Sequence, residues 1–262
     1  TDLSLTTAES ALNGVVHKEG EAANGVSLLL TNGAVWNNQD WNQSSAVLDK
    51  ISFAGSHLAS LKGGSNASNG GVIFQKTDKD ISIDNYSGYT RVFYAHEAAT
   101  PTTIKGGDFR IKNAAADSAI TLTTDSTGLN TESTKAADKN LVSATLNALA
   151  NKLWYTAYTT NERNLTGKAE IAEGLTTSAA SKRIEDITFD GTTGQGSYVY
   201  TPQSEVTTDP IKESETLTYD RQALATQPNT KGNRIVSALY TDNTAYDKQH
   251  PMVVDMNGHS LH

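Results

Sequence analysis

Short clusters of apolar residues recur along the chain, each three to five residues long and bounded by Gly, Asn, Asp or Ser. Apolar and polar positions alternate within several of them, which predicts β-strands because successive strand residues face opposite sides of a sheet. The pattern therefore predicts many short strands. The clusters are Val26–Leu30, Ile51–Phe53, Val72–Phe74, Ile81–Ile83, Val92–Tyr94, Phe109–Ile111, Ile120–Leu122, Ile187–Phe189, Tyr198–Tyr200 and the series within Ile235–Leu261.

The spacing of these clusters distinguishes two architectures. A sandwich or barrel needs hairpins with turn signals about 8–12 residues apart, whereas a solenoid repeats one longer turn of chain that stacks on the next. Asn-Gly pairs rarely lie between two alternating strands of equal length, as a hairpin requires. The near-constant long period favours a solenoid. The intervals Leu28 to Ile51, Ile51 to Ile73, Ile73 to Val92 and Val92 to Ile111 are 23, 22, 19 and 19 residues.

One stretch departs from the β pattern. Between Lys135 and Leu153 the apolar residues recur at helical spacing, which predicts an α-helix with Val142, Leu146, Leu149 and Leu153 on one face. Asp138 is the expected N-cap of this helix. We expect residues 126–182 to form a helix-plus-strand insertion on a β scaffold.

Composition supports the all-β interpretation and limits the partners. Thr, Ser and Asn number 34, 23 and 20, or 77 of 262 residues, and they suit half-wetted strands and tight turns. The net charge of −8 argues against nucleic acid and anionic membranes as partners. The longest apolar run, Val92–Ala95, is far shorter than the roughly 20 residues of a membrane span. Cysteine is absent, which excludes disulfides, thiolate metal sites and cysteine nucleophiles.

The ends of the sequence predict a fragment of a longer protein. Thr1–Leu12 has neither the basic region nor the apolar region of an export signal, and the chain does not begin with Met. It ends at Gly258–His262, inside what resembles a strand.

Several segments resemble the passenger domains of bacterial autotransporters, the type V secreted adhesins. They are residues 26–38, 81–94, 106–111, 253–261 and the helix-plus-strand unit 141–175. The resemblance implies a right-handed parallel β-helix over residues 1–262 as a single domain. It further implies a non-enzymatic protein of the cell surface, held at the bacterial outer membrane by a translocator domain and acting in adhesion or aggregation. The expected partner is a host or bacterial surface protein or glycan, and we expect a monomer that does not insert into the membrane.

Within such a fold, amide side chains at inward corners are expected to hydrogen-bond to equivalent positions in neighbouring turns. Asn32, Asn85 and Asn113 are the candidates.

Charged residues offer an alternative function, a carbohydrate-active β-helix enzyme of the polysaccharide lyase or glycosidase type. Asp78, Asp80 and Asp84 form the densest carboxylate cluster, which such an enzyme could use for Ca²⁺ or for acid/base chemistry. A solvated turn explains the cluster more simply. Asp108 and Arg110 alternate on one strand face and could hold an acidic sugar, although an exposed charged strand explains them equally well.

No catalytic or metal-binding motif stands out, so we expect no catalytic residue, no metal and no cofactor. The six histidines lack metal-ligand spacing, and the glycine-rich Gly191–Gly196 lacks that of a phosphate-binding loop, which predicts a turn. Glu185, Asp186 and Asp190 are expected to point outward from their strand.

Aromatic rings are the remaining candidates, because sugars stack on exposed rings. Trp36 and Trp41 flank a stretch of amide side chains, and Tyr86 and Tyr89 flank a Ser-Gly turn. Trp36 and the tyrosines are also explained by packing in the interior. The candidate ligand-binding residues are Trp41, Tyr89, Asp108 and Arg110.

Overall fold

The structure is a computed structural model that describes residues 1–16, 25–40, 55–160 and 164–200. The chain divides into two compact units, Thr1–Tyr200 and Thr201–His262, and all described residues belong to the first. The expectation of a single domain over residues 1–262 stays a prediction beyond Tyr200. Trp41, Ile51 and the strands expected after Tyr200 lie outside the described residues.

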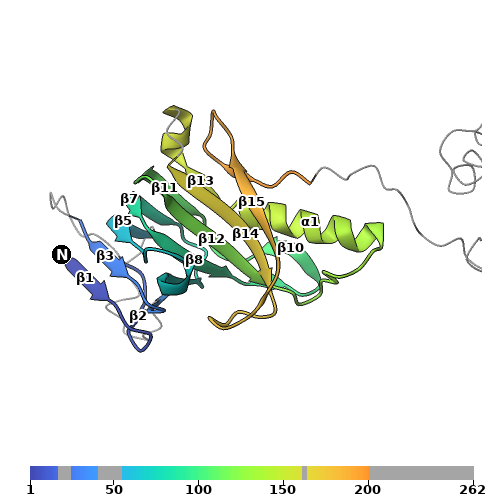
Figure 1. The fold of residues 1–262 in the computed structure, drawn as a ribbon, viewed down its shortest axis with the longest axis horizontal. Coiled ribbons are helices and arrows are strands. Elements are labelled where there is room, and N and C mark those ends of the chain that lie inside the picture. Colours follow the sequence, from blue (N-terminus) through green and yellow to red (C-terminus); the bar gives the residue numbers. More distant parts are fainter. Residues whose placement is uncertain (17–24, 41–54, 161–163, 201–262) are drawn as a thin grey trace, which may run out of the picture. The chain divides into compact units, whose positions relative to one another are not determined.

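Two β-sheets, called sheet A and sheet B, form the body of this unit, and most of their strands run parallel to their neighbours (Figure 1). In sheet A all neighbouring strands are parallel. In spatial order its strands are β1 (Asp2–Leu5), β3 (Ser27–Leu30), β5 (Ser56–Lys62), β7 (Ile81–Ser87), β11 (Phe109–Ala114) and β13 (Leu153–Tyr155).

Sheet B begins with parallel neighbours and ends with antiparallel ones. Its parallel strands are β2 (Ala11–Asn13), β4 (Val35–Asn38), β6 (Gly71–Gln75), β8 (Tyr89–Tyr94), β12 (Ser118–Asp125) and β14 (Leu165–Ala172). The antiparallel strands β15 (Ser181–Phe189) and β16 (Gly196–Ser197) follow β14.

The chain alternates between the two sheets. From β1 to β8, and again from β11 to β14, each strand of sheet A is followed by one of sheet B. A short antiparallel pair, β9 (His96–Glu97) and β10 (Thr100–Ile104), separates the two series. The prediction of a mostly β protein is confirmed, the sheets are parallel over most of their strands, and neither closes into a barrel within the described residues.

Corners between the sheets explain why Asn-Gly does not indicate a hairpin here. Asn32 and Gly33 both have positive φ, 56° and 75°, and the N–H of Ala34 donates to the carbonyl of Thr31. Asn and Gly tolerate this left-handed backbone best. The turn redirects the chain from β3 to β4, which lie in different sheets.

The predicted spacing is right at one step and wrong at another. Ile73 and Val92, 19 residues apart, are direct partners in β6 and β8. Val92 and Ile111 are not, because Ile111 belongs to sheet A and Val92 pairs with Leu122. Leu28 pairs with Leu61. The connections differ in length, so the repeat is longer and less regular than the clusters suggest.

The hydrophobic core lies between the inner faces of the two sheets. The residues that face it alternate with outward-facing ones along each strand, as in Phe109 and Ile111 around Arg110. Core residues include Leu28, Leu58, Ile81, Ile83, Phe109 and Ile111 from sheet A, and Trp36, Ile73, Val92, Ile120, Leu122 and Ile171 from sheet B.

A buried amide network lies at one margin of this core. Asn38 Nδ2 donates to Gln75 Oε1, and Ser56 Oγ donates to Asn38 Oδ1 at 2.6 Å. Gln75 Nε2 in turn donates to the carbonyl of Lys79 at 2.8 Å. Each side chain finds partners, which offsets the cost of burying it.

The asparagines expected at inward corners are exposed instead. Asn85 Nδ2 donates to the carbonyl of Ala59, and Asn113 Nδ2 donates to that of Asp84. Asn32 Nδ2 likewise donates to the carbonyl of Thr6. Each bond therefore reaches an earlier part of the chain, but its acceptor is a backbone carbonyl and not the side-chain amide of another residue.

The helix is confirmed as α1 (Ala136–Ala150), which contacts β10, β12, β14 and β16. Val142, Leu146 and Leu149 are buried, whereas Leu153 begins β13. Lys135 and not Asp138 occupies the N-cap position, and Asp138 lies in the first turn. The expected insertion 126–182 needs a correction, because β13 and β14 continue the two sheets and pair in parallel with β11 and β12. The connection that contains α1, between β12 and β13, and the short 3-10 helix η3 (Thr156–Thr160), between β13 and β14, lie outside the two sheets.

Candidate ligand-binding surfaces

Arg110 binds two carboxylates on the outer face of sheet A. Its Nε lies 2.7 Å from Asp80 Oδ2 and its Nη2 lies 2.7 Å from Asp108 Oδ2. Asp80 precedes β7 and Asp108 precedes β11, so the guanidinium joins neighbouring strands. The backbone N–H of Asp108 also donates to Asp80 Oδ1 at 2.8 Å. The sequence placed Asp108 and Arg110 on one strand face but did not reveal Asp80 as their partner.

Trp154 and Lys152 complete this network. Arg110 and Trp154 are register partners, and the guanidinium carbon lies 4.5 Å from the centroid of the indole ring. Trp154 Nε1 donates to Asp108 Oδ2 at 3.0 Å. Lys152 Nζ donates to the carbonyl of Gly106 and lies 3.9 Å from Asp108 Oδ1. Two cations thus face two anions, and a ligand carboxylate would have to displace an existing partner of Arg110.

The carboxylates of Asp78, Asp80 and Asp84 do not converge. Asp80 binds Arg110, whereas Asp84 Oδ2 lies 3.2 Å from His57 Nε2. Asp78 lines a separate groove. The three carboxylates form a cluster along the chain but not in space.

The predicted aromatic candidates are also separated. Tyr89 lies on β8 of sheet B, so it is not on the sheet that carries Asp108 and Arg110. Its hydroxyl donates to Thr121 Oγ1 at 3.0 Å. Trp41, the fourth candidate, lies outside the described residues.

Two other aromatics are interior residues, as their packing explanation predicted. Trp36 is fully buried and its Nε1 donates to the carbonyl of Gly14 at 2.9 Å. The Tyr86 hydroxyl donates to the carbonyl of Ala119 at 2.7 Å. Burial raises the pKa of Tyr86 far above its ordinary value. Neither ring is free to stack on a ligand.

Sheet B carries a groove of about 530 Å³, which falls within the range of small-ligand sites, roughly 300–1,000 Å³. Its apolar lining includes Phe74, Phe93 and Leu175. Phe74 and Phe93 are register partners on β6 and β8, and their rings stack with centroids 4.9 Å apart. Sequence reasoning missed this pair, although the 19-residue interval between the two strands also separates these phenylalanines.

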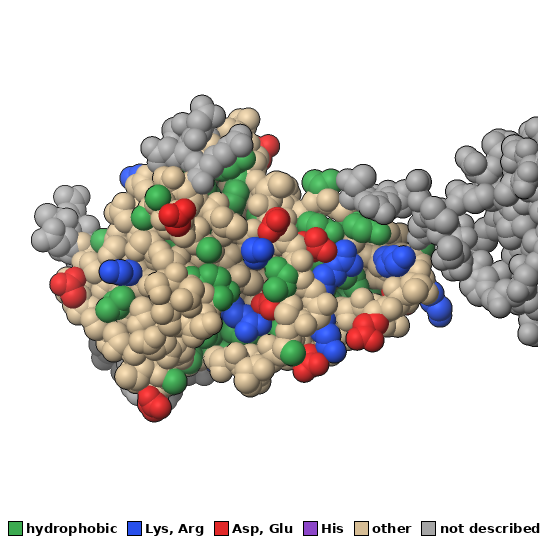
Figure 2. All heavy atoms as spheres, in the orientation of Figure 1, with side chains coloured by type: hydrophobic (Ala, Val, Ile, Leu, Met, Phe, Trp, Pro, Cys, Tyr) green, Lys and Arg blue, Asp and Glu red, His purple; other side chains and the backbone are tan. Residues whose placement is uncertain are grey.

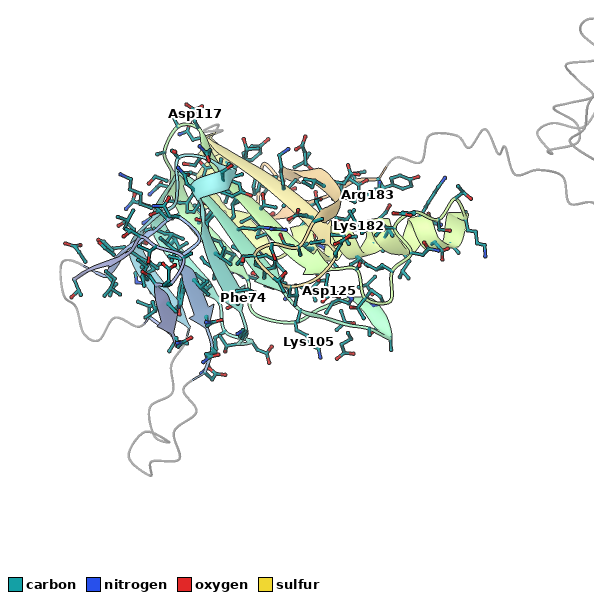
Figure 3. All side chains as sticks on the ribbon, turned by 60° about the horizontal axis from the view of Figure 1, so that its bottom comes forward. Phe74, Lys105, Asp117, Asp125, Lys182 and Arg183 are labelled. Atoms are coloured by element: carbon teal, nitrogen blue, oxygen red, sulfur yellow. The ribbon has the colours of Figure 1, made fainter. Side chains whose placement is uncertain are left out.

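Charges of both signs surround the groove. Lys76, Lys105, Asp78 and Glu97 all line it. Lys76 Nζ lies 5.2 Å from the Phe74 ring centroid and donates to Asn37 Oδ1, and Lys105 Nζ lies 3.7 Å from Glu97 Oε1. Figure 3 labels Phe74 and Lys105 on this part of the protein. An apolar floor with a charge-balanced rim suits a ligand without strong net charge.

A buried ion pair lies beside the groove residues. Arg91 Nη2 is 2.8 Å from Glu170 Oε2, and these side chains are 17% and 6% exposed. Thr123 Oγ1 donates to the same carboxylate oxygen at 2.6 Å. The Arg91 guanidinium also lies 4.7 Å from the Phe93 ring centroid. The three polar side chains come from three neighbouring strands, so the pair ties together β8, β12 and β14.

The carboxylates around β15 have structural partners. Glu185 Oε1 accepts from Arg183 Nε at 2.7 Å, and Asp186 Oδ1 lies 3.3 Å from Lys168 Nζ. Asp190 Oδ1 accepts from the backbone N–H groups of Thr192 and Thr193, which lowers the pKa of Asp190. The residues after Asp190 form the turn that the glycine-rich stretch predicted.

The part of the chain that the structure describes lacks two further features. No group of three or more His, Asp or Glu side chains there is placed to hold a metal ion. No helix there has the length and apolar character needed to cross a membrane.

No protein-family model matches the chain, and comparisons with curated proteins and with solved structures gave no significant match. The resemblance to autotransporter passengers therefore remains a prediction from the sequence.

Proposed function

We propose that this chain is a non-enzymatic passenger of a bacterial autotransporter that acts at the cell surface in adhesion or aggregation. In this proposal its two sheets are the sides of a right-handed parallel β-helix. The chain would reach the cell surface as part of a longer protein with a translocator domain.

The observation that carries the proposal is the alternation of successive strands between two parallel sheets. Stacked turns of this kind bury one continuous core and leave long outer faces, which repeat proteins use as extended binding surfaces. The outer faces here carry polar and charged side chains of both signs. Figure 2 shows these charges interspersed around β14, β15 and α1, without a large area of one sign.

The groove on sheet B is the proposed contact site for a surface protein or glycan. It offers Phe74 and Leu175 as apolar surface, with Lys105 and Glu97 as hydrogen-bonding groups. The Arg110 network is a weaker candidate, because its charged groups already bind one another.

The test is display of the whole chain on bacteria through a supplied outer-membrane anchor. We expect the displayed chain to increase cell settling or attachment to host cells and glycan-coated surfaces above the level of the anchor alone. A groove variant, Phe74→Ala with Lys105→Ala, is expected to lose attachment. The matched control, Lys62→Ala with Lys112→Ala, changes exposed residues of sheet A and should retain it. Equal behaviour of the displayed chain and the anchor alone would contradict the proposal.

The alternative function, a carbohydrate-active enzyme, is favoured by one observation: Asp78 and Glu97 line the same groove. Two carboxylates flanking a bound sugar are the usual requirement of glycoside hydrolysis. The purified chain and the variants Asp78→Asn and Glu97→Gln would be assayed on a panel of polysaccharides. Cleavage that both variants abolish would establish this alternative, and inactivity of the unaltered chain on the whole panel would argue against it.

A further inference from the structure

The strand β15 has a long unpaired edge. On one side it pairs with β14 from Ser181 to Ile187, with a register shift that leaves Lys182 without a partner residue in β14. On the other side only Thr188 and Phe189 have partners, in β16, so among the described residues no strand pairs with Ser181–Ile187 there. Figure 1 shows β15 next to β14 at the end of the sheet. A row of unpaired backbone N–H and C=O groups is a template for another strand.

The side chains along this edge include charged residues, which edge strands commonly carry as protection, together with one exposed apolar residue. Ile184 is 47% exposed, and it is one of two large hydrophobic residues described as exposed, the other being Val199. Two cations, Lys182 and Arg183, precede Ile184, and two anions, Glu185 and Asp186, follow it. Figure 3 labels Lys182 and Arg183 beside each other on β15.

This order of charges is self-complementary only when two copies of the strand pair antiparallel. If two copies of β15 pair antiparallel about Ile184, each Lys182 faces Asp186 of the other copy and each Arg183 faces Glu185. The two Ile184 side chains then face each other at the centre. Opposite charges and apolar pairs directly across antiparallel strands are stabilising. A parallel pairing in register would place like charges opposite each other, which is destabilising.

We propose that the Ser181–Ile187 edge of β15 binds the same edge of a second copy of this chain. The two strands pair antiparallel across a two-fold axis at Ile184, and the two B sheets become one continuous sheet. Such an isologous contact uses the same patch on both copies and closes at a dimer. This self-association replaces the expectation of a monomer.

The length of the free edge fits this pairing. The seven residues of one copy pair with seven of the other, so the contact ends next to β16 on each side. The N–H of Glu173 donates to the Ala180 carbonyl, so the β14–β15 hairpin continues to Ala180 and its turn lies at residues 174–179. The partner's chain would leave the contact through this turn.

The ion pairs already present on β15 do not prevent the contact. Lys182 Nζ lies 3.1 Å from Glu173 Oε1, and Asp186 is 78% exposed next to Lys168. Exposed pairs of this kind exchange partners at little cost, because each contributes little stability. Arg183 and Glu185 of one strand lie on the same side, where Arg183 Nη2 also donates to the Tyr198 hydroxyl at 3.4 Å. In the dimer, Arg183 and Glu185 would form a four-membered charge network with those of the second copy.

The inference rests on the proposed function in one respect, since it assigns the aggregation activity to a homotypic contact. One short edge gives weak binding, but many copies on two facing cells multiply it. Two experimental outcomes distinguish the β15 contact from the proposed function. A chain that stays monomeric while displaying cells still aggregate removes only the β15 contact. A chain that dimerises while displaying cells neither adhere nor aggregate removes the proposed function.

The experiment measures the association of the purified 262-residue chain by sedimentation velocity at rising concentration. An acidic variant carries Lys182→Glu and Arg183→Glu, and a basic variant carries Glu185→Lys and Asp186→Lys. Each alone should lose the dimer, with association weakened about tenfold or more because opposite charges become like charges. An equimolar mixture of the two should restore it as a heterodimer. The control Lys62→Glu with Lys112→Glu makes the same charge change as the acidic variant on sheet A and should still dimerise.

Three results would overturn the inference: a monomeric unaltered chain at every concentration, equal loss in the control, or a mixture of folded variants that stays monomeric. Circular dichroism checks that the variants fold. If either charge variant does not fold, Ile184→Lys and Ile184→Val decide the question instead. Loss of the dimer in Ile184→Lys alone supports the contact, and equal behaviour of these two variants refutes it.

Discussion

Phe93 is 1% exposed while its stacked partner Phe74 remains partly open to solvent, although the two are register partners on neighbouring strands. Both strands have a neighbour on each side, and the difference arises because the Arg91 guanidinium covers the Phe93 ring. One residue thus stabilises the sheet, and the other supplies surface to the groove.

This asymmetry predicts unequal effects of truncation. Phe93→Ala is expected to lower the free energy of unfolding by about 3–5 kcal/mol, as buried aromatic truncations do. Phe74→Ala should cost less, about 1–2 kcal/mol, because part of its surface is already in water. Urea unfolding of both variants followed by circular dichroism provides the measurement. A larger loss for Phe74→Ala than for Phe93→Ala would contradict the assignment.

The buried pair of Arg91 and Glu170 predicts non-additive mutations. Glu170→Gln leaves the guanidinium buried without its carboxylate, which should cost about 3–5 kcal/mol of stability. The double variant Arg91→Met with Glu170→Leu should cost markedly less, because no charge remains buried. A double-mutant cycle of unfolding free energies measures the coupling. Additive losses would show that the two side chains do not depend on each other.

Arg110 is expected to matter more for the environment of Trp154 than for stability. Its side chain is 41% exposed, so the ion pairs with Asp80 and Asp108 should contribute no more than about 1 kcal/mol. Arg110→Ala uncovers the indole ring, which should shift tryptophan emission to longer wavelength. Lys112→Ala on the same strand is the control and should leave the emission unchanged. A large loss of stability without a spectral change would indicate a different role.

The turn after β15 predicts a specific dependence on pH. Backbone N–H groups of Thr192 and Thr193 hold the pKa of Asp190 below its ordinary value of 3.8. A carboxyl whose pKa is lower in the folded state stabilises the fold above the unfolded-state pKa, and this stabilisation disappears as pH falls through the folded-state pKa. Asp190→Ala should therefore be less stable than the unaltered chain at neutral pH, with a difference that shrinks in strong acid. Unfolding at several pH values tests this, and a constant difference would contradict it.

The strands and the helix could be predicted because each depends on a local pattern. Val92–Tyr94 and Phe109–Ile111 lie in the strands β8 and β11, and Val142, Leu146 and Leu149 face the protein from α1. Register could not be predicted in the same way. The spacing of the clusters does not show which strands become partners, because the connections differ in length and the β9–β10 pair and α1 interrupt the repeat without changing the apolar pattern of the strands.

The same distinction between local pattern and strand register applies to the candidate site. The alternation of Asp108 and Arg110 predicts that both lie on one strand face, and in the structure Arg110 Nη2 lies 2.7 Å from Asp108 Oδ2. Asp80 reaches Arg110 from the neighbouring strand, 28 residues before Asp108, so its role needs the register of β7 and β11. Tyr89 was grouped with these residues by chemistry alone, and the alternation of strands between sheets separates them.

Strands β12 and β14 stay in step over eight consecutive residue pairs, from Ser118 with Leu165 to Asp125 with Ala172, although a whole helix intervenes between them in the chain. Pairing in these sheets is thus insensitive to the size of the connecting segments. During evolution, insertions and deletions should accumulate at those segments and leave the ladders intact. Relatives of this protein would then differ most in length where the backbone passes from one layer to the other, and a peptide epitope grafted there would be displayed without disturbing the interior.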